Sequence, residues 1–356
     1  PGGAAARQGK LKTDDRIIAV AQGEKAFESV IDMRLNNVVQ LIRGKRGTKV
    51  GLQILRKNKD GFDTLKIVIV RDKILLKDGE AQSNIFEQPH AGENKNKQEP
   101  LRIGVIKLPS FYVDFNDRRK NPKKYKSSSR DVKAHLEKFV DENVDGVILD
   151  LRNNGGGGLD EAINMAGLFI GLNPVVIVRQ SGGRRVTVHR SRERAVYTGP
   201  LVIMLNRYSA SASEILAGAM HDFQRALLVG DTTTFGKGTV QNIFQLPEGY
   251  GALKVTIAQF YRVSGWSTQN RGVETSIVLP SLNNAREIGE STLENALPWR
   301  SIDQVSYRPK GNFKTVLPVL KKLSLKRVTD SEYFQQIDED VQEFLTSIKP
   351  LKYTSI

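Results

Sequence analysis

Apolar residues in the first 75 positions recur at the spacings of short strands and one helix. Residues 11–20 predict a turn that leads into an apolar strand, and residues 48–55 and 65–70 alternate as strands. Residues 33–42 carry apolar side chains at helical spacing, at Leu35, Val38, Val39 and Ile42. Residues 1–75 therefore predict a small β-rich unit.

The pattern changes after a polar stretch. Residues 76–100 show little periodicity and predict a linker or a surface excursion. Beyond them, strands are predicted at 102–108, 147–151, 175–178 and 201–205, and helices at 131–142, at 159–170 and from the turn 206–214 to about Phe223. Alternating strands and helices are typical of a βαβ sheet with ligand chemistry at the strand ends. Residues 101–282 thus predict an α/β core.

Residues 283–356 are more polar, and their periodicity is helical. Helices are predicted at 314–325, where Pro318 interrupts the pattern, and at 331–348. We expect an appended helical domain that is cut short at Ile356.

Composition agrees with a soluble chain of several domains. The 356 residues are 39% hydrophobic and 26% charged, and domains of about 100–200 residues imply two or three of them. No apolar window approaches the ~20 residues of a membrane span, and residues 1–10 lack the apolar stretch of a signal peptide. Cysteine is absent, which excludes disulfides, thiolate metal sites and a cysteine nucleophile.

The formal charge of +15 raises the question of anionic partners. One dense basic run covers residues 118–130, with Tyr125 as its one aromatic residue. Without an interleaved stacking pattern, this run predicts a solvated loop, or an electrostatic patch for an acidic or membrane partner. We expect no nucleic-acid partner and at most peripheral membrane contact.

A turn with three serines joins a buried strand to a helix. The turn contains Ser209, Ser211 and Ser213, and alanines leave space around the hydroxyls. Glu214 follows Ser211 by three residues, so a capping box explains this pattern completely. The turn alone does not decide between a cap and a nucleophile.

Lys237 lies between Gly236 and Gly238 in an apolar context. Burial lowers the pKa of a lysine, and neutral lysine can take a proton from serine. A lysine on an exposed turn is the alternative.

The order of elements in residues 1–75 resembles a PDZ domain, with the likeness carried by residues 11–20 and 33–56. Asp14 and Asp15 stand where many PDZ domains have Gly-Asp. The carboxylate-binding loop and first strand of that family would precede Pro1, so the chain is a fragment or another segment supplies the strand. A PDZ domain captures peptide C-termini by strand addition, and a packing domain is the alternative.

Taken together, the serine turn and the lysine loop resemble the C-terminal processing (tail-specific) protease family. The shared segments are residues 149–157, 206–215 and 236–241, and the likeness continues through 260–263, 267–269 and 294–299. The second half is similar to the large-chain branch of periplasmic tail-specific proteases of Gram-negative bacteria. The resemblance implies an α/β multi-domain fold: a β/α serine protease core of the crotonase/ClpP-like type, a truncated PDZ domain and a helical C-terminal segment.

The resemblance also implies roles for single residues. Ser211 would be the nucleophile, Lys237 the general base and Gln241 the residue that orients the lysine. Asp222 matches an acidic position of the branch, and we expect it to give structural support. The turn 231–234 is one residue longer than the usual family turn, so the mechanism requires that Lys237 still reaches Ser211.

The glycine run Gly155–Gly158 would supply the oxyanion hole. Glycine lets backbone N–H groups approach a reacting group closely. By resemblance, the N–H of Gly157, with Gly156 as the second choice, and the N–H of Ala212 form the hole, while Asp150 and Arg152 fix the shape of the loop. Phosphate binding is a weaker interpretation, because no complete phosphate-loop motif is present.

Other chemistries have weaker support in the sequence. A Ser-His-Asp triad would need one of His90, His135, His189 and His221, which are surface candidates. No cluster has metal-ligand spacing, and we expect no cofactor. A non-catalytic scaffold that binds protein C-termini and a thioester enzyme of the crotonase-type fold remain as alternatives.

The resemblance implies an endopeptidase of the periplasm or the periplasmic face of the inner membrane. Its substrates would be proteins with unstructured, apolar C-terminal tails, with a helical-repeat lipoprotein as adaptor. The domains we expect are 1–75 PDZ-like, 76–100 linker, 101–282 protease core and 283–356 helical C-terminal domain.

Overall fold

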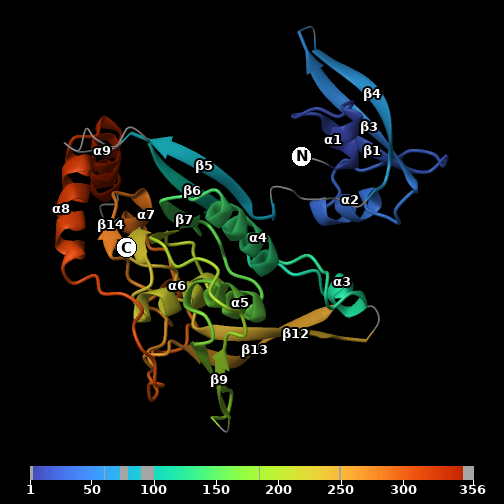
Figure 1. Cartoon of the computed structure of the whole chain (residues 1–356). Coiled ribbons are helices and arrows are strands. Elements are labelled where there is room, and N and C mark those ends of the chain that lie inside the picture. Colours follow the sequence, from blue (N-terminus) through green and yellow to red (C-terminus); the bar gives the residue numbers. More distant parts are fainter. Residues whose placement is uncertain are drawn as a thin grey trace, which may run out of the picture. The chain divides into compact units, whose positions relative to one another are not determined.

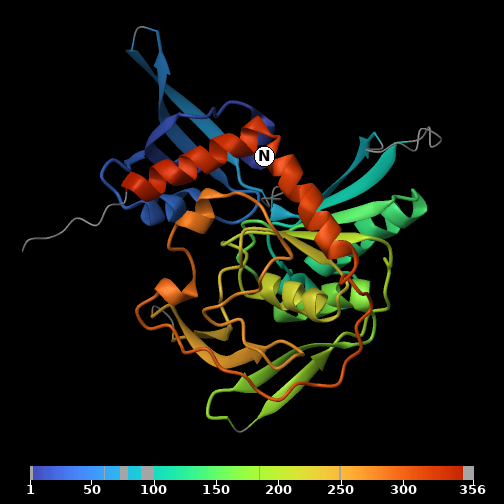
Figure 2. The same cartoon turned by 90° about the vertical axis from the view of Figure 1, so that its left-hand side faces the viewer.

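The computed structural model of the chain is shown in Figure 1 and, turned by a right angle, in Figure 2. It describes residues 3–59, 61–72, 79–89, 100–183, 185–247 and 250–347. The chain forms two compact units, Pro1–Gly79 and Glu80–Ile356.

The first unit is a four-stranded antiparallel sheet with two short helices. The strand order is β2-β1-β3-β4. The bounds are α1 Ala4–Gln8, β1 Arg16–Gln22, β2 Glu28–Ser29, α2 Leu35–Ile42, β3 Lys49–Asn58 and β4 Gly61–Val70. Its core consists of Val20, Val30, Val50, Leu52, Ile54, Ile67 and Ile69. The strands and the helix predicted from the apolar spacing are therefore confirmed, although the short β2 and α1 were not predicted.

The two aspartates at the start of β1 have separate structural roles. Asp14 takes a left-handed backbone conformation, with φ of 67°, and forms the turn. Asp15 accepts two hydrogen bonds of 2.8 Å from the guanidinium of Arg56 on β3, and these bonds lower the pKa of Asp15 to about 2. The pair ties the entry of β1 to the neighbouring strand.

The second unit is built on a six-stranded sheet of order β14-β11-β10-β7-β6-β5. Its bounds are β5 Gln82–Gln88, β6 Leu101–Lys107, β7 Gly146–Asp150, β10 Leu201–Leu205, β11 Leu227–Gly230 and β14 Ile277–Val278. All neighbours are parallel except β5, which pairs antiparallel with β6. β5 lies within the predicted linker 76–100 and was missed because its residues are polar at an exposed sheet edge.

A second sheet of this unit is antiparallel and has the strand order β12-β13-β8-β9. Its strand β8 packs against the helices α5 and α6. Its bounds are β8 Pro174–Gln180, β9 Val186–Arg190, β12 Thr239–Gln245 and β13 Ala252–Tyr261. Helices α5 (Leu159–Ile170) and α6 (Ala212–Asp222) lie between the two sheets in both views (Figures 1 and 2). This layering buries the largest hydrophobic core of the chain.

Helix α4 (Ser128–Asp141) covers β6 with the side on which Val132, Leu136 and Phe139 are buried. The ring of Phe139 lies directly over Gly104, where an added Cβ would come within 2.5 Å of the ring. The strand therefore needs a glycine at that position. The basic run 118–130, predicted as a loop, instead includes the end of α3 (Phe115–Lys120) and the first turn of α4. The guanidinium of Arg130 stacks 4.1 Å from the ring centroid of Tyr125.

The C-terminal part of the second unit is helical, as predicted. Its elements are α7 Leu282–Ala285, a short 3₁₀ turn Glu290–Thr292, α8 Val316–Thr329 and α9 Glu332–Ser347. Pro318 is the third residue of α8, where its missing N–H costs no helical hydrogen bond. α9 packs against α7 and α8. Within the described residues, none of the helices has the length and apolarity needed to cross a bilayer.

Candidate active site

The serine turn begins where β10 ends and is shaped by side-chain bonds to the glycine loop. Asn206 and Asn153 are linked by the bonds Asn206 Nδ2 to Asn153 Oδ1 (2.8 Å) and Asn153 N–H to Asn206 Oδ1 (2.9 Å). Ser209 Oγ donates to the carbonyl of Leu151, and Ser213 Oγ donates to the carbonyl of Asn154. Two serines of the turn are therefore structural, which leaves Ser211 as the candidate nucleophile.

Ser211 is the N-cap of α6 and has a backbone conformation that side chains rarely adopt. Its φ and ψ are 57° and −109°. Such strain persists only where surrounding bonds impose it, and it is common at reactive positions. The residue is half-buried at the positive end of an eleven-residue helix, where developing negative charge is stabilised.

Glu214 connects the serine turn to the lysine loop. This carboxylate is completely buried. Its Oε2 accepts the backbone N–H groups of Ser211 (2.8 Å) and Lys237 (2.9 Å). Its Oε1 accepts the N–H of Gly236 (2.7 Å) and the hydroxyl of Thr234 (2.6 Å). Burial raises the pKa of Glu214 to about 7, although the four donors act in the opposite direction.

The side chain of Lys237 is half-buried and directed toward Gln241. Its Nζ donates to Gln241 Oε1 at 2.9 Å. Burial, followed by the charge of Lys254, lowers the pKa of Lys237. Among the described residues Nζ makes this bond and none to Ser211 Oγ. Contacts between a base and a nucleophile are often looser before substrate binds.

The glycine loop lies against the N-terminus of α6. A Cβ added to Gly156 would lie 2.9 Å from Ser211 Cβ and 3.0 Å from Ala212 N. The N–H of Gly156 donates to Asn154 Oδ1 at 2.9 Å. Within the described part of the chain, the N–H groups of Gly157 and Ala212 have no acceptor. Of the two predicted glycines, Gly157 is therefore the one with a donor available to a ligand.

The expected supporting residues lie apart from Ser211. Arg152 donates from Nε (2.9 Å) and Nη2 (2.7 Å) to the carboxylate of Asp150 and so shapes the start of the glycine loop. Asp222 lies at the far end of α6, about 16 Å along the axis at 1.5 Å per residue. There it bonds Arg262 and Ser264, and nothing places it in reach of a reacting group.

The longer turn 231–234 is held at several points. Thr232 N–H donates to Asn284 Oδ1, and Thr233 Oγ1 donates to the carbonyl of Arg271. Because Thr234, Gly236 and Lys237 all bond Glu214, the additional residue does not separate the lysine loop from the serine turn.

No described histidine contacts Ser211. His135 bonds Ser83 on β5, His189 lies on β9, and His221 bonds Arg262, while His90 lies outside the described residues. The described residues also contain no cluster of three or more His, Asp or Glu side chains that would hold a metal ion.

Sequence reasoning missed the role of Glu214. Its spacing from Ser211 was fully explained by a capping box, and its second pair of donors comes from a loop 20 or more residues away. The glycines around Lys237 were a signal of this role. If the loop is buried, its backbone N–H groups need a hydrogen-bond acceptor, and a nearby carboxylate can be that acceptor.

Three family profiles match the sequence. The profile of Peptidase family S41 matches residues 102–279, that of the C-terminal domain of tail specific protease matches residues 283–354, and that of the PDZ domain matches residues 1–55. The S41 match covers both sheets apart from β5, together with the helices between them.

Several known proteases are similar to this chain over most of its length. The Tail-specific protease of Haemophilus influenzae is 39% identical over 353 residues, which span 96% of this chain and 47% of that protein. The Carboxy-terminal processing protease CtpA of Bacillus subtilis is 30% identical over 346 residues, or 96% of this chain and 64% of that protein. A solved photosystem II D1 C-terminal processing protease is 25% identical, with 77% of this chain and 65% of that chain covered and a TM-score of 0.47. The chain thus spans about half to two thirds of the length of these relatives.

Proposed function

This chain belongs to peptidase family S41, and on that premise we propose that it is a serine endopeptidase that uses Ser211 and Lys237 as a catalytic dyad. The single observation that carries the proposal is that one carboxylate oxygen, Glu214 Oε2, accepts hydrogen bonds from the backbone N–H groups of both Ser211 and Lys237. This shared acceptor holds the two backbones close together. The dyad requires such proximity of a nucleophile and a base.

In the proposed reaction, neutral Lys237 removes the proton of Ser211 as Oγ attacks the peptide carbonyl. The lowered pKa of Lys237 supports the neutral form. Gln241 Oε1 accepts one hydrogen bond from Lys237 Nζ, which fixes the amine and leaves its lone pair free to turn toward Ser211. Lys237 then returns the proton to the leaving amine, and water hydrolyses the acyl enzyme.

The oxyanion of the tetrahedral intermediate would bind the N–H groups of Gly157 and Ala212. Both donors are without an acceptor within the described residues. Ala212 follows Ser211 directly, and Gly157 follows Gly156, whose added Cβ would lie 2.9 Å from Ser211 Cβ. The N-terminus of α6 adds its positive dipole end. Gly156 supports the hole indirectly, since its N–H bonds Asn154.

The substrates we propose are proteins with unstructured, apolar C-terminal tails. The PDZ match and the protease relatives fit protein substrates. An exposed apolar surface on the β12–β13 hairpin supports apolar binding, formed by Ile243, Phe244, Leu246, Leu253, Val255 and Ile257. A helical-repeat lipoprotein adaptor and a periplasmic location are further parts of the proposal, drawn from the resemblance to this family.

The domain division we propose follows the same premise. A PDZ-like unit covers 1–75, the protease core 101–282 and a helical domain 283–356, with the segment 76–100 between the first two. The family matches support it, and β5 extends the sheet of the core into that segment.

The test is hydrolysis of an unstructured protein with an apolar tail by wild type, Ser211→Ala and Lys237→Ala. We expect both variants to lose nearly all cleavage while keeping the melting temperature of the wild type. An active-site fluorophosphonate should label wild type but not Ser211→Ala. Tail binding without hydrolysis by wild type would instead support the non-catalytic scaffold, and cleavage by Lys237→Ala at the wild-type rate would remove the lysine from the mechanism.

A further inference from the structure

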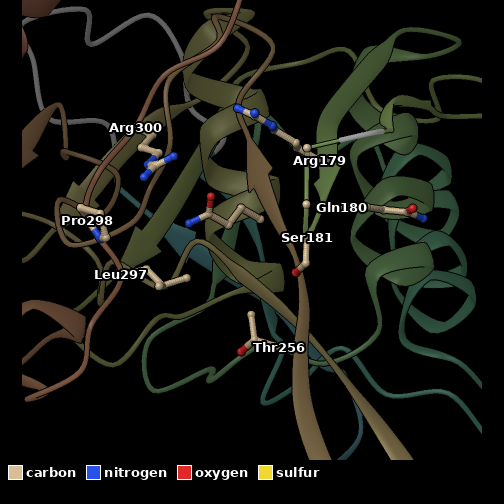
Figure 3. A pocket seen from close by; sticks show the side chains of 10 residues that line it. Arg179, Gln180, Ser181, Thr256, Leu297, Pro298 and Arg300 are labelled. Carbon is tan, nitrogen blue, oxygen red and sulfur yellow. The ribbon is translucent and has the colours of Figure 1, made fainter.

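A cavity of about 370 Å³ opens where the end of β8 meets β13 and the loop before Ser301. Figure 3 shows the side chains of Arg179 and Arg300 extending toward each other across it, whereas Gln180 points away. The rest of the wall is apolar or neutral and includes Leu297, Pro298, Thr256 and Ser181. Two arginines from distant parts of the sequence therefore line the same cavity.

The cavity adjoins the lysine of the candidate dyad. Thr256 in its wall pairs with Gln241 across the β12–β13 ladder, and directly paired residues place their side chains on the same face. Gln241 Oε1 in turn accepts a hydrogen bond from Lys237 Nζ. The cavity thus begins next to the side chain that holds the lysine amine.

A second link runs through Asn270. Its backbone N–H donates to the carbonyl of Gly236 at 2.7 Å, and its Nδ2 donates to the carbonyl of Leu297 at 3.0 Å. One residue therefore fixes both the lysine loop and the apolar wall of the cavity. A group bound in the cavity would have a defined position relative to Lys237.

The described residues that line the cavity include two arginines and no carboxylate. Among the described residues, neither the guanidinium of Arg179 nor that of Arg300 has an ion pair or hydrogen bond. Arginine forks match carboxylates in bidentate geometry, and hydroxyls such as those of Thr256 and Ser181 can donate to the same group.

We infer that this cavity is a substrate subsite that binds a carboxylate of the polypeptide held at Ser211. The carboxylate belongs either to an acidic side chain near the scissile bond or to the chain terminus, and its chemistry is the same in both cases. Because the subsite receives part of the substrate, the inference rests on the proposed peptidase function.

The experiment measures kcat/KM for a set of peptides derived from one neutral parent. In the first arm a single Glu is moved along the positions on both sides of the cleaved bond, and each peptide is compared with its Gln counterpart. In the second arm the parent is compared with and without C-terminal amidation. Wild type should prefer the carboxylate form by about tenfold or more in one arm. The arm that shows this preference identifies the source of the carboxylate.

The variant Arg179→Gln/Arg300→Gln should reduce this ratio to near one. Because the ratio is formed within each protein, a general change in activity cancels. Arg308→Gln, which removes an exposed arginine outside the cavity, should keep the wild-type ratio. Circular dichroism establishes that each variant is folded, and Arg300→Gln alone replaces the double variant if that variant is not folded.

Two results would overturn the inference: no carboxylate preference in either arm, or a preference that survives in the folded arginine variant. Failure of the peptidase proposal is seen separately, as absence of cleavage of the neutral parent by wild type. In that case the same peptide pairs are labelled with fluorescein and their binding to Ser211→Ala is titrated. A dissociation constant that is lower for the carboxylate form supports the inference, and equal constants overturn it.

Discussion

Glu214 accepts the backbone N–H of Lys237 through the oxygen, Oε2, that also accepts the N–H of Ser211. The serine turn and the lysine loop come from different strand connections, and this buried carboxylate is the atom group that both contact. The relative position of nucleophile and base therefore depends on a residue that takes no part in the proton transfer itself.

Replacing Glu214 with glutamine should lower kcat/KM by about 10²-fold, the cost of a misplacement of roughly 1 Å at a reacting centre. The amide keeps the volume but puts an NH₂ group where two donors converge, so at least one of the two loops loses its acceptors. Cleavage rates below the melting temperature measure the effect. Glu137→Gln, on the exposed side of α4, is the control and should retain the activity of wild type.

The proton of Glu214 should also be visible in the pH dependence of stability. The folded chain holds this proton up to about pH 7, whereas an ordinary glutamate releases it near 4.5. The folded state then binds more protons between these values, so the free energy of unfolding falls as pH rises through this window, by about 3 kcal/mol for this group. Urea unfolding between the two pH values should show this slope in wild type and its absence in Glu214→Gln. Equal slopes in the two proteins would contradict the assignment.

Removing the charge of Lys254 should move the acidic limb of the pH–rate profile to higher pH. Lys254 helps to lower the pKa of Lys237, after burial. In Lys254→Gln the ammonium form of Lys237 becomes more stable, the pKa of Lys237 rises, and the neutral base appears at higher pH. Profiles of kcat/KM with a neutral peptide measure the shift, and high salt should have the same effect on wild type. A limb that stays in place or moves toward acid would contradict the prediction.

A methyl group at Gly157 should impair catalysis more than one at Gly155. The added Cβ at Gly157 would lie 2.3 Å from the carbonyl oxygen of Phe111, and its φ is 145°, so the loop must shift. Gly155 has open space around it. We expect Gly157→Ala to lower kcat by about 10²–10³-fold, the cost of losing one oxyanion donor. Gly155→Ala is the matched control, and equal losses in the two variants would argue against Gly157 as the donor.

Replacing Asp222 with asparagine should affect stability more than chemistry. Burial alone would raise the pKa of Asp222, but bonds from His221 and the charge of Arg262 hold it below 3.8. Its stabilising contribution is therefore complete above that value and is lost as the pH falls below it. Asp222→Asn leaves the buried guanidinium of Arg262 without its carboxylate partner, which lowers the free energy of unfolding by about 3–5 kcal/mol. Urea unfolding at neutral pH measures this loss, and Asp303→Asn, an exposed aspartate, should leave stability unchanged.

The apolar pattern predicted the mixed α/β fold, and the resemblance of the serine and lysine segments predicted the family, which the S41 match confirms. Helix α5 and strand β10 have the predicted bounds. These elements are buried on several sides, so their sequences carry a strong signal.

Elements at exposed edges escaped prediction for the opposite reason. β5 has polar residues on an outer strand, and the β12–β13 hairpin shows its apolar residues to solvent. The roles of Ser211, Lys237 and Gln241 stay predictions from resemblance, to which the structure adds positions. What no local pattern contained was the convergence of Arg179 and Arg300, because it depends on how a strand end and a distant loop meet.

The anchoring of the 231–234 turn has a consequence for how this site can vary. Thr234, Gly236 and Lys237 are all bound to one carboxylate, while Thr232 and Thr233 are attached elsewhere on the surface. The position of Lys237 is thus set by bonds that the loop itself makes, to the carboxylate of Glu214 and from the N–H of Asn270, and not by the number of residues that follow the preceding strand. Insertions or deletions upstream of Thr234 can accumulate there as neutral changes, with the chemistry insulated from the length of the chain that leads to it.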